Sequence, residues 1–447
     1  MNKRYSILSI AAVAVMAATL FGSTYTQSQM TGNSMSISTT EVDLMQKIHD
    51  MGGLSLVMPS AYAAIDCDSV DSGRNVVEFN LTGESADLPI MGGSTYKAMT
   101  FSGQTPGPTL RVTQGDVVKM TLSIPEGEPT PHGNDMHASQ MNAVPDFGAV
   151  QPGTSKTYCY IAEVPGTFKY HCSGVNVAAM DQHVLSGMYG MTIVDPLDGY
   201  KKLMVEKTKV QGGEVVKERT LYSGDALEFQ LQYNQLYLTD EGNYDMSAMM
   251  QHHQDLTVVN GMSFGYVPNE VHNELILGDK GKNIFVVQPW NSADLKQYQS
   301  QLLFVPTGTH TRWFIENQGN EPVYFHIVGE IIDRVIQANR VQAQGTETWL
   351  IGGSQGAIMD VVFDEPGVYV AVNHDYAAIF SGAATVIVVG NPFGLEVGDA
   401  QSYAEVLGNP SDAIPPAGMN SMSHPKMNLH GLYTDTRADE IKAELGI

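Results

Sequence analysis

Positively charged residues are scarce in this sequence. Its 24 Lys and Arg residues stand against 48 Asp and Glu residues, which gives a net charge of −24 at neutral pH. A surface of this sign repels the phosphate backbone of nucleic acids, so we expect no nucleic-acid partner. The same field opposes anionic ligands. An anion handled by this chain therefore requires strong local positive charge, such as a metal ion.

Cysteine is scarce as well. The 447 residues contain only 3 cysteines, which are Cys67, Cys159 and Cys172. An odd number leaves at least one thiol outside any intramolecular disulfide. In an exported protein such a thiol needs another use, and metal ligation is a common one.

Long apolar runs are also few, and one of them stands at the amino terminus. Lys3 and Arg4 precede an apolar run from Tyr5 to Gly22, and the polar stretch Ser23–Gln29 follows it. This order is typical of an export signal. The run has about 18 residues, on the border between a cleaved signal and a short membrane anchor. We therefore expect an exported protein, periplasmic, extracellular or at the cell surface, whose amino-terminal segment is either cleaved or kept as an anchor.

Turn-forming residues, in contrast, are plentiful. The chain has 44 Gly and 21 Pro, and between them lie short strand-like runs, a texture typical of β-sandwiches. Such runs in the first half are Val76–Leu81, Tyr96–Phe101, Val117–Leu122, Ser155–Ile161, Thr167–His171 and Tyr189–Val194. Those in the second half are Ile284–Gln288, Thr311–Asn317, Val323–Val328, Glu347–Ile351, Ala357–Phe363 and Thr385–Val389.

The strand-like runs divide the chain into two similar parts. Val164–His171 and Asp364–His374 echo each other, since each contains a Pro-Gly turn, then an aromatic strand, then a histidine. We therefore predict an all-β chain with two tandem β-sandwiches. The expected segments are a signal peptide or anchor (1–29), a leader (30–65), a first sandwich (66–200), a second sandwich (201–395) and a tail (396–447).

Several of the 13 histidines lie near predicted strand ends. Two imidazoles, one thiolate and a weak thioether are the ligands of an electron-transfer copper centre. The residues His132, Cys172, His183 and Met188 supply this set, and the last three fall within one strand–loop–strand unit. The sequence therefore predicts a first copper site in the first sandwich.

Strand geometry separates a second metal site from the first. Neighbouring side chains on a strand point to opposite faces, so His171 and Cys172 do not easily serve one metal. His132 and His137 are separated by an odd number of residues and should also diverge if their segment is extended. We therefore group Cys172 with His132, and His171 with His137. His374, at the end of the echoed strand, is the candidate for a third imidazole.

Five segments together resemble the copper-containing nitrite reductases of the multicopper oxidase superfamily. They are His132–His137, Tyr170–Met188, Tyr324–Gly329, Thr346–Ile351 and Val368–Ala384. The resemblance implies two cupredoxin-like Greek-key β-sandwiches and a homotrimer with two coppers per chain. It implies a type 1 copper that takes an electron from a small redox protein, either a cupredoxin or a c-type cytochrome. It also implies a type 2 copper that reduces nitrite to nitric oxide and water.

The resemblance assigns roles residue by residue. The type 1 ligands that it implies are His132, Cys172, His183 and Met188. The type 2 ligands that it implies are His137, His171 and His374, the last from a neighbouring subunit. Its catalytic residues fall on Asp135 and His326. The supporting residues are Glu347 and Thr348, which match the pair that positions the catalytic histidine, and Val328 as a further neighbour.

Elementary chemistry supports the same roles. Reduction of nitrite to nitric oxide needs a Lewis acid, an electron source and proton donors. Asp135 stands between two candidate ligands, where its carboxyl group can hydrogen-bond to a metal-bound oxygen. His326 can hold a proton near neutral pH.

Two other interpretations stay open. A two-domain multicopper oxidase needs a trinuclear copper cluster built from His-x-His pairs, and this sequence has no such pair. A non-enzymatic copper store or electron carrier uses the type 1 ligands but leaves Asp135, His326 and His374 unexplained. Copper content separates the three, because the reductase holds two coppers per chain, the oxidase four and the carrier one.

The two remaining cysteines provide a first test. If Cys172 binds copper, Cys67 and Cys159 form an even pair in an oxidising compartment. We predict that they form a disulfide that joins the amino-terminal segment to the first sandwich. Peptide mapping without reductant should recover both cysteines in one cross-linked fragment. Recovery of both as free thiols would contradict the prediction.

Overall fold

The computed structural model describes residues 73–90, 95–141, 146–174, 177–267 and 302–392. The expected signal segment (1–29), leader (30–65), strand Ile284–Gln288 and tail (396–447) lie outside these residues. Cys159 is buried and disulfide-bonded, whereas Cys67 lies outside the described part, so their pairing stays a prediction. Among the described residues, no helix is long and apolar enough to cross a membrane.

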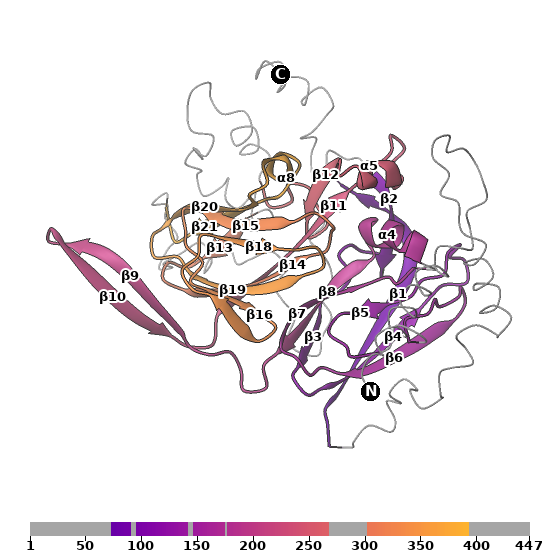
Figure 1. The fold of residues 1–447 in the computed structure, drawn as a ribbon, viewed down its shortest axis with the longest axis horizontal. Coiled ribbons are helices and arrows are strands. Elements are labelled where there is room, and N and C mark those ends of the chain that lie inside the picture. Colours follow the sequence, from indigo (N-terminus) through magenta and orange to yellow (C-terminus); the bar gives the residue numbers. More distant parts are fainter. Residues whose placement is uncertain (1–72, 91–94, 142–145, 175–176, 268–301, 393–447) are drawn as a thin grey trace, which may run out of the picture.

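The first sandwich consists of two four-stranded sheets (Figure 1). One sheet has the order β2-β1-β4-β6. Its strands are β1 (Val76–Pro89), β2 (Thr95–Phe101), β4 (Val117–Ser123) and β6 (Ser155–Ile161). The other has the order β3-β8-β7-β5. Its strands are β3 (Leu110–Thr113), β5 (Asp135–Met136), β7 (Gly166–His171) and β8 (Tyr189–Asp195).

Strand alternation builds the core of this sandwich. In β1, Val77, Phe79 and Leu81 are buried while the residues between them are exposed. They join a cluster that also contains Cys172 and Met188. Two of the predicted copper ligands are therefore part of the packed interior, which holds them in place.

The second sandwich pairs a six-stranded with a five-stranded sheet. The six-stranded sheet contains, in spatial order, β12 (Leu256–Val259), β11 (Leu227–Leu236), β14 (His310–Asn317), β19 (Gly356–Val362), β16 (Arg334–Gln337) and β17 (Arg340–Ala343). The five-stranded sheet contains β13 (Leu303–Val305), β21 (Ala384–Val389), β20 (Gly367–Asn373), β15 (Val323–Val328) and β18 (Thr348–Ile351). Trp313 stacks on Phe229 in the core between them, with ring centroids 4.5 Å apart.

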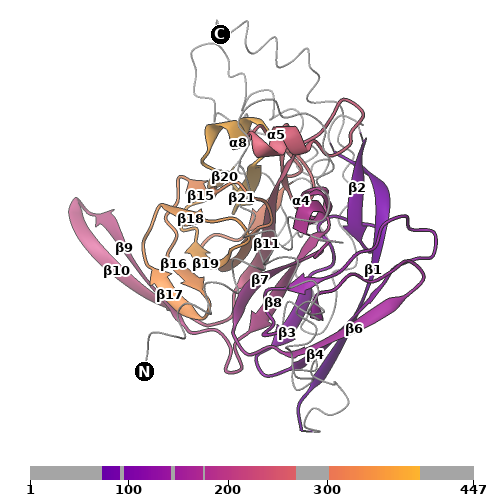
Figure 2. The same ribbon diagram turned by 45° about the vertical axis from the view of Figure 1, so that its right-hand side comes forward.

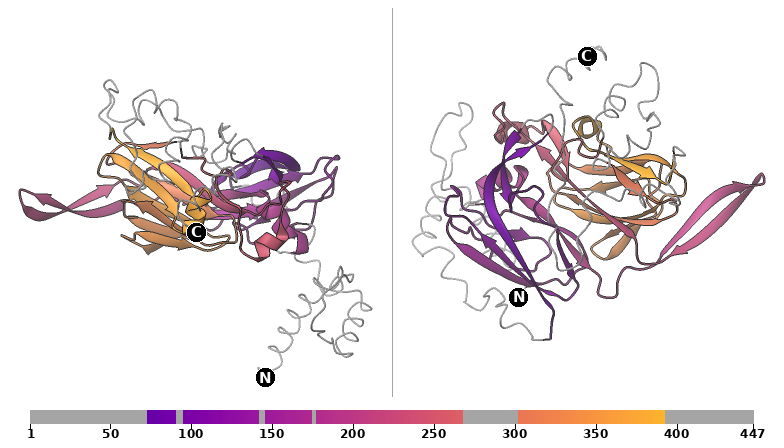
Figure 3. Two further views of the ribbon diagram at one scale, coloured as in Figure 1. Left: turned by 90° about the horizontal axis from the view of Figure 1, so that it is seen from above. Right: turned by 180° about the vertical axis from the view of Figure 1, so that it is seen from behind.

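A two-stranded hairpin lies between the two sandwiches in the sequence and projects from the rest of the molecule. It consists of β9 (Leu203–Gln211) and β10 (Glu214–Tyr222). Gly212 and Gly213 make its turn with φ angles of 61° and 88°, a left-handed pair that glycine adopts without strain. Figures 1 and 3 show that it extends from the second sandwich on the side away from the first.

The two sandwiches lie side by side (Figure 2), and several polar contacts join them. Strand β7 of the first contacts β14 and β19 of the second. Lys169 of β7 donates to the backbone oxygen of Gln318 at 2.5 Å, and the Gln318 amide donates to the Gly190 oxygen at 2.9 Å. Arg111 bridges the two parts by pairing with Asp195 and Glu228. The end of β7 is therefore braced from both sandwiches.

In the part of the chain that the structure describes, short helices occupy three loops. They are α4 (Val177–Leu185), α5 (Met246–Met250) and α8 (Tyr376–Phe380). The unit between Cys172 and Met188, which we expected to be strand–loop–strand, thus contains an α-helix in its loop. Helix α4 brings His183 back toward the strand that precedes it, as a compact ligand set requires.

Candidate metal centres

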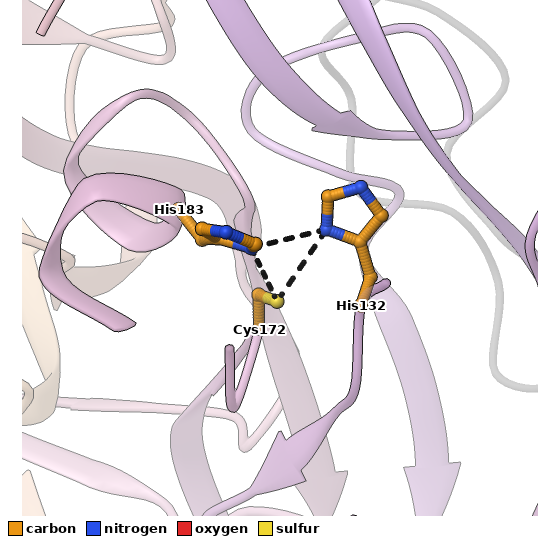
Figure 4. A group of neighbouring side chains, drawn as sticks. All are labelled: His132, Cys172 and His183. Carbon is orange, nitrogen blue, oxygen red and sulfur yellow. Dashed lines mark hydrogen bonds between the residues drawn. The ribbon is translucent and has the colours of Figure 1, made fainter. Parts of the chain in front are cut away.

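The first group of candidate ligands is built from three parts of the first sandwich. Figure 4 shows His132, Cys172 and His183 turned toward one another. His132 forms a backbone bridge with Val150, Cys172 follows β7, and His183 lies on α4. The two imidazole Nδ1 atoms are 3.1 Å apart. The Cys172 Sγ lies 3.3 Å from Nδ1 of His183 and 3.8 Å from Nδ1 of His132.

Met188 lies beside this group. It is fully buried, and its backbone oxygen accepts from the Cys172 N–H at 3.0 Å. A Cβ on Gly83 of β1 would meet Met188 Cε at 3.0 Å and His132 Cβ at 3.4 Å. The methionine and the first histidine therefore approach the same point of β1, where only a glycine leaves them room.

Burial determines the charge of these ligands. It lowers the pKa of His183 to about 4 and also lowers the pKa of His132. Burial raises the pKa of the Cys172 thiol to about 11, although the backbone N–H groups of Gly133 and Gly174 act in the opposite direction. Two neutral imidazoles and a soft sulfur thus converge in the buried interior of the first sandwich. This donor set fits a copper ion, which would replace the thiol proton.

The second group lies on the opposite side of the same strand end. The Nε2 atoms of His137 and His171 are 3.1 Å apart. Asp135 pairs with His171 across β5 and β7, and its Oδ2 lies 3.7 Å from the His171 Nε2. The His171 Nδ1 donates to the Cys172 backbone oxygen at 2.9 Å, which leaves Nε2 with its lone pair free for a cation. These residues also fit a metal ion.

The predicted partners on the second sandwich form a separate pair. The rings of His326, on β15, and His374, after β20, lie 5.2 Å apart between centroids. The His326 Nδ1 donates to the Glu347 backbone oxygen at 2.6 Å, and Thr348 Oγ1 lies 3.4 Å from the same nitrogen. Val328 stands two residues beyond His326 on β15 and packs against the apolar core of this sandwich.

His374 does not complete the second group within one chain. Among the described residues, two clusters could hold a metal ion, and His374 belongs to neither. The structure therefore brings together His132, Cys172 and His183, and separately His137, His171 and Asp135. It leaves His374 with His326 at another place on the surface of the chain.

A buried cation that the sequence pattern did not reveal lies beside the second group. Lys169 lies two residues before His171 on β7 and is 3% exposed. Burial lowers the pKa of Lys169 to about 8, and burial raises the pKa of its neighbour Glu316 to about 8. The Lys169 charge also acts on Asp135. A lysine within an otherwise apolar and aromatic strand was the signal that could have identified it.

The titratable groups of the second group have shifted pKa values. Burial raises the pKa of Asp135, and the neighbouring His137 and Lys169 partly oppose this shift. Burial lowers the pKa of His171 to about 3, and the nearby Lys169 lowers it further. His171 is therefore a neutral ligand near neutral pH, and the Asp135 carboxyl keeps its proton to a higher pH than an exposed aspartate does.

The chain is similar to known copper proteins. Residues 84–199 match the multicopper oxidase family model. The copper-containing nitrite reductase of Neisseria meningitidis is 27% identical over 297 residues, which cover 65% of this chain and 64% of the relative, just under two thirds of its length. The copper-containing nitrite reductase of Pseudomonas chlororaphis is 27% identical over 369 residues, 80% of this chain and 87% of the relative.

A solved structure extends the likeness to the fold. The copper nitrite reductase structure from Nitrosomonas europaea matches with a TM-score of 0.54 and 29% identity, covering 71% of this chain and 95% of that one. The all-β prediction of two cupredoxin sandwiches is confirmed. The resemblance that the five sequence segments indicated is confirmed as well: this chain is similar over most of its length to the copper-containing nitrite reductases, within the multicopper oxidase superfamily.

Proposed function

We propose that this protein is a copper-dependent nitrite reductase that converts nitrite, one electron and two protons to nitric oxide and water. The observation that carries the proposal is the adjacency of Cys172 and His171. Each belongs to a different group of candidate ligands, and the His171 Nδ1 hydrogen-bonds to the Cys172 backbone oxygen. An electron that reaches the first group is therefore one residue away from the second.

Copper bound at the two groups would supply the one-electron couple and the Lewis acid that this reaction needs. The first ion would be held by His132, Cys172, His183 and Met188. The second would be held by His137 and His171, with His374 from another copy. Lys169 adds a buried positive charge near the second group, which favours an anionic substrate in a strongly acidic chain.

Two residues of this chain are placed to move protons. Burial raises the pKa of Asp135, so its carboxyl group keeps a proton to higher pH than an exposed aspartate, and it can donate that proton to an oxygen of nitrite. His326 donates its Nδ1 proton to the Glu347 backbone, which leaves Nε2 to take up and release a proton. In an assembly that brings His374 to the second group, His326 comes with it because the two rings are neighbours.

The alternatives lack comparable support. A multicopper oxidase needs more clustered histidines than the two groups that the described residues form. An electron carrier has no use for the second group or for Asp135 beside it. Export remains part of our proposal, and the disulfide at Cys159 supports an oxidising compartment. A small cupredoxin or c-type cytochrome as the electron donor also remains part of our proposal.

The first group is tested by Cys172→Ala. Charge transfer from a thiolate to copper produces intense visible absorption, so the variant should lose its colour and retain the second copper. His137→Ala is the matched control, and it should keep the colour and lose the other copper. Absorption spectra with copper counts per chain measure both. Intense colour in Cys172→Ala would make the type 1 assignment wrong.

The divided second site predicts a ring of identical chains, which we propose is a homotrimer. His137→Ala and His374→Ala should each lack the second copper, because each removes one ligand from every site. In rings assembled from equal amounts of both variants, about one quarter of the interfaces pair an intact His137 with an intact His374. Copper and activity should return to about that fraction of the wild-type level.

Mass measurement of the wild-type protein accompanies this mixing experiment. A monomer that holds two coppers would contradict the shared site. Mixed rings that regain no copper would do so as well, because that result means that both histidines serve within one chain.

The proton donors are tested by Asp135→Asn and His326→Asn. Neither is a proposed ligand, so both variants should keep two coppers and the visible spectrum. Each should lose about 10²–10⁴-fold in turnover, as is typical for one general acid or base. The double variant should lose less than the product of the two effects if both act on one proton path.

The exposed residues Asp198 and His253 offer matched controls, and Asp198→Asn and His253→Asn should leave turnover unchanged. The wild-type pH profile should have an acidic optimum. Activity falls as rising pH deprotonates Asp135, and the raised pKa of that group moves this fall to higher pH. Near-normal turnover in folded, two-copper Asp135→Asn and His326→Asn chains would remove both residues from the mechanism.

A further inference from the structure

A buried carboxylate lies behind one of the candidate copper ligands. Glu128 follows β4 in the loop that leads to His132, and it is 8% exposed. Its Oε1 lies 3.4 Å from the Nε2 of His132. The other ring nitrogen, Nδ1, is the one that faces Cys172 and His183. The imidazole is thus held between the ligand cluster on one side and a carboxylate on the other.

Strand β1 fixes this carboxylate from the opposite direction. The Ser85 backbone N–H donates to Oε2 at 2.8 Å, and the Ser85 hydroxyl donates to Oε1 at 2.8 Å. Among the described residues, His132 is the basic side chain within ion-pair distance of Glu128. A buried carboxylate needs such hydrogen bonds to remain ionised. The charge is therefore held against the histidine and is not shared with a lysine or arginine.

The geometry has two chemical consequences for His132. A carboxylate can only accept here, so Nε2 carries the proton and Nδ1 presents its lone pair to the cluster. A negative charge behind a ligand also strengthens its donation and stabilises the more positive oxidation state of a bound metal. Copper(II) gains more than copper(I), and the reduction potential falls.

We propose that Glu128 is a positioning residue that orients His132 through Nε2 and lowers the reduction potential of copper bound at the first group. This inference rests on the proposed type 1 copper. It makes Glu128 a determinant of which electron donors can reduce the protein, because the donor must have a potential low enough to pass its electron on.

The test is the reduction potential of the copper-loaded, full-length protein. Glu128→Gln keeps the shape of the side chain and removes its charge. We expect visible colour to remain and the equilibrium for reduction to shift at least tenfold toward copper(I), which is 59 mV for a one-electron couple. Glu126→Gln is the matched control, since Glu126 lies in the same loop and is exposed. Its shift should be less than twofold.

A second variant covers the case in which Glu128→Gln does not fold. Glu128→Asp keeps the charge but moves it away from His132, so we expect a smaller shift in the same direction. An unchanged or lower potential in a coloured Glu128 variant overturns the inference and leaves Glu128 with a purely structural role in tying the loop to β1. Absence of the thiolate absorption in the wild-type protein instead removes the proposed function.

Discussion

The alternation of side chains at the end of β7 is the constraint on which both candidate metal centres depend. His171 and Cys172 are consecutive, so the strand directs one toward His137 and the other into the core. The peptide group that joins them also accepts the hydrogen bond that orients the His171 ring. The adjacency of His171 and Cys172 thus explains both why the two groups lie on opposite sides and why a hydrogen bond links them.

The two groups also differ in how far their side chains are buried. The first is enclosed in the core of a sandwich, where burial lowers the pKa of both imidazoles and raises the pKa of the thiol. The second lies at the edge of that sandwich, where His137 is exposed and Asp135 is half-buried. The first group is therefore held by close packing, whereas the second is accessible from outside the chain at His137.

Charge is placed differently over the whole chain and around the two candidate metal centres. The net charge of −24 is spread over the whole molecule, while Lys169 lies buried next to the second group. The field of a buried charge is screened less than that of an exposed one, and Lys169 acts on both Asp135 and Glu316. In the first group the sign is reversed, because Glu128 lies behind His132.

The sequence by itself determined the fold class, most of the strands and the grouping of His132 with Cys172 and of His137 with His171, since strand alternation and ligand chemistry are local properties of β7 and its neighbours. It did not show that His374 lies with His326, apart from the second group. It did not indicate the β9–β10 hairpin as a separate arm, or helix α4 in the loop after Cys172. Only the tertiary structure decided that Ser85 and Glu128 meet behind His132 and that Lys169 is buried against β14. Residues far apart in the chain make these contacts, and packing between sheets and between sandwiches brings them together.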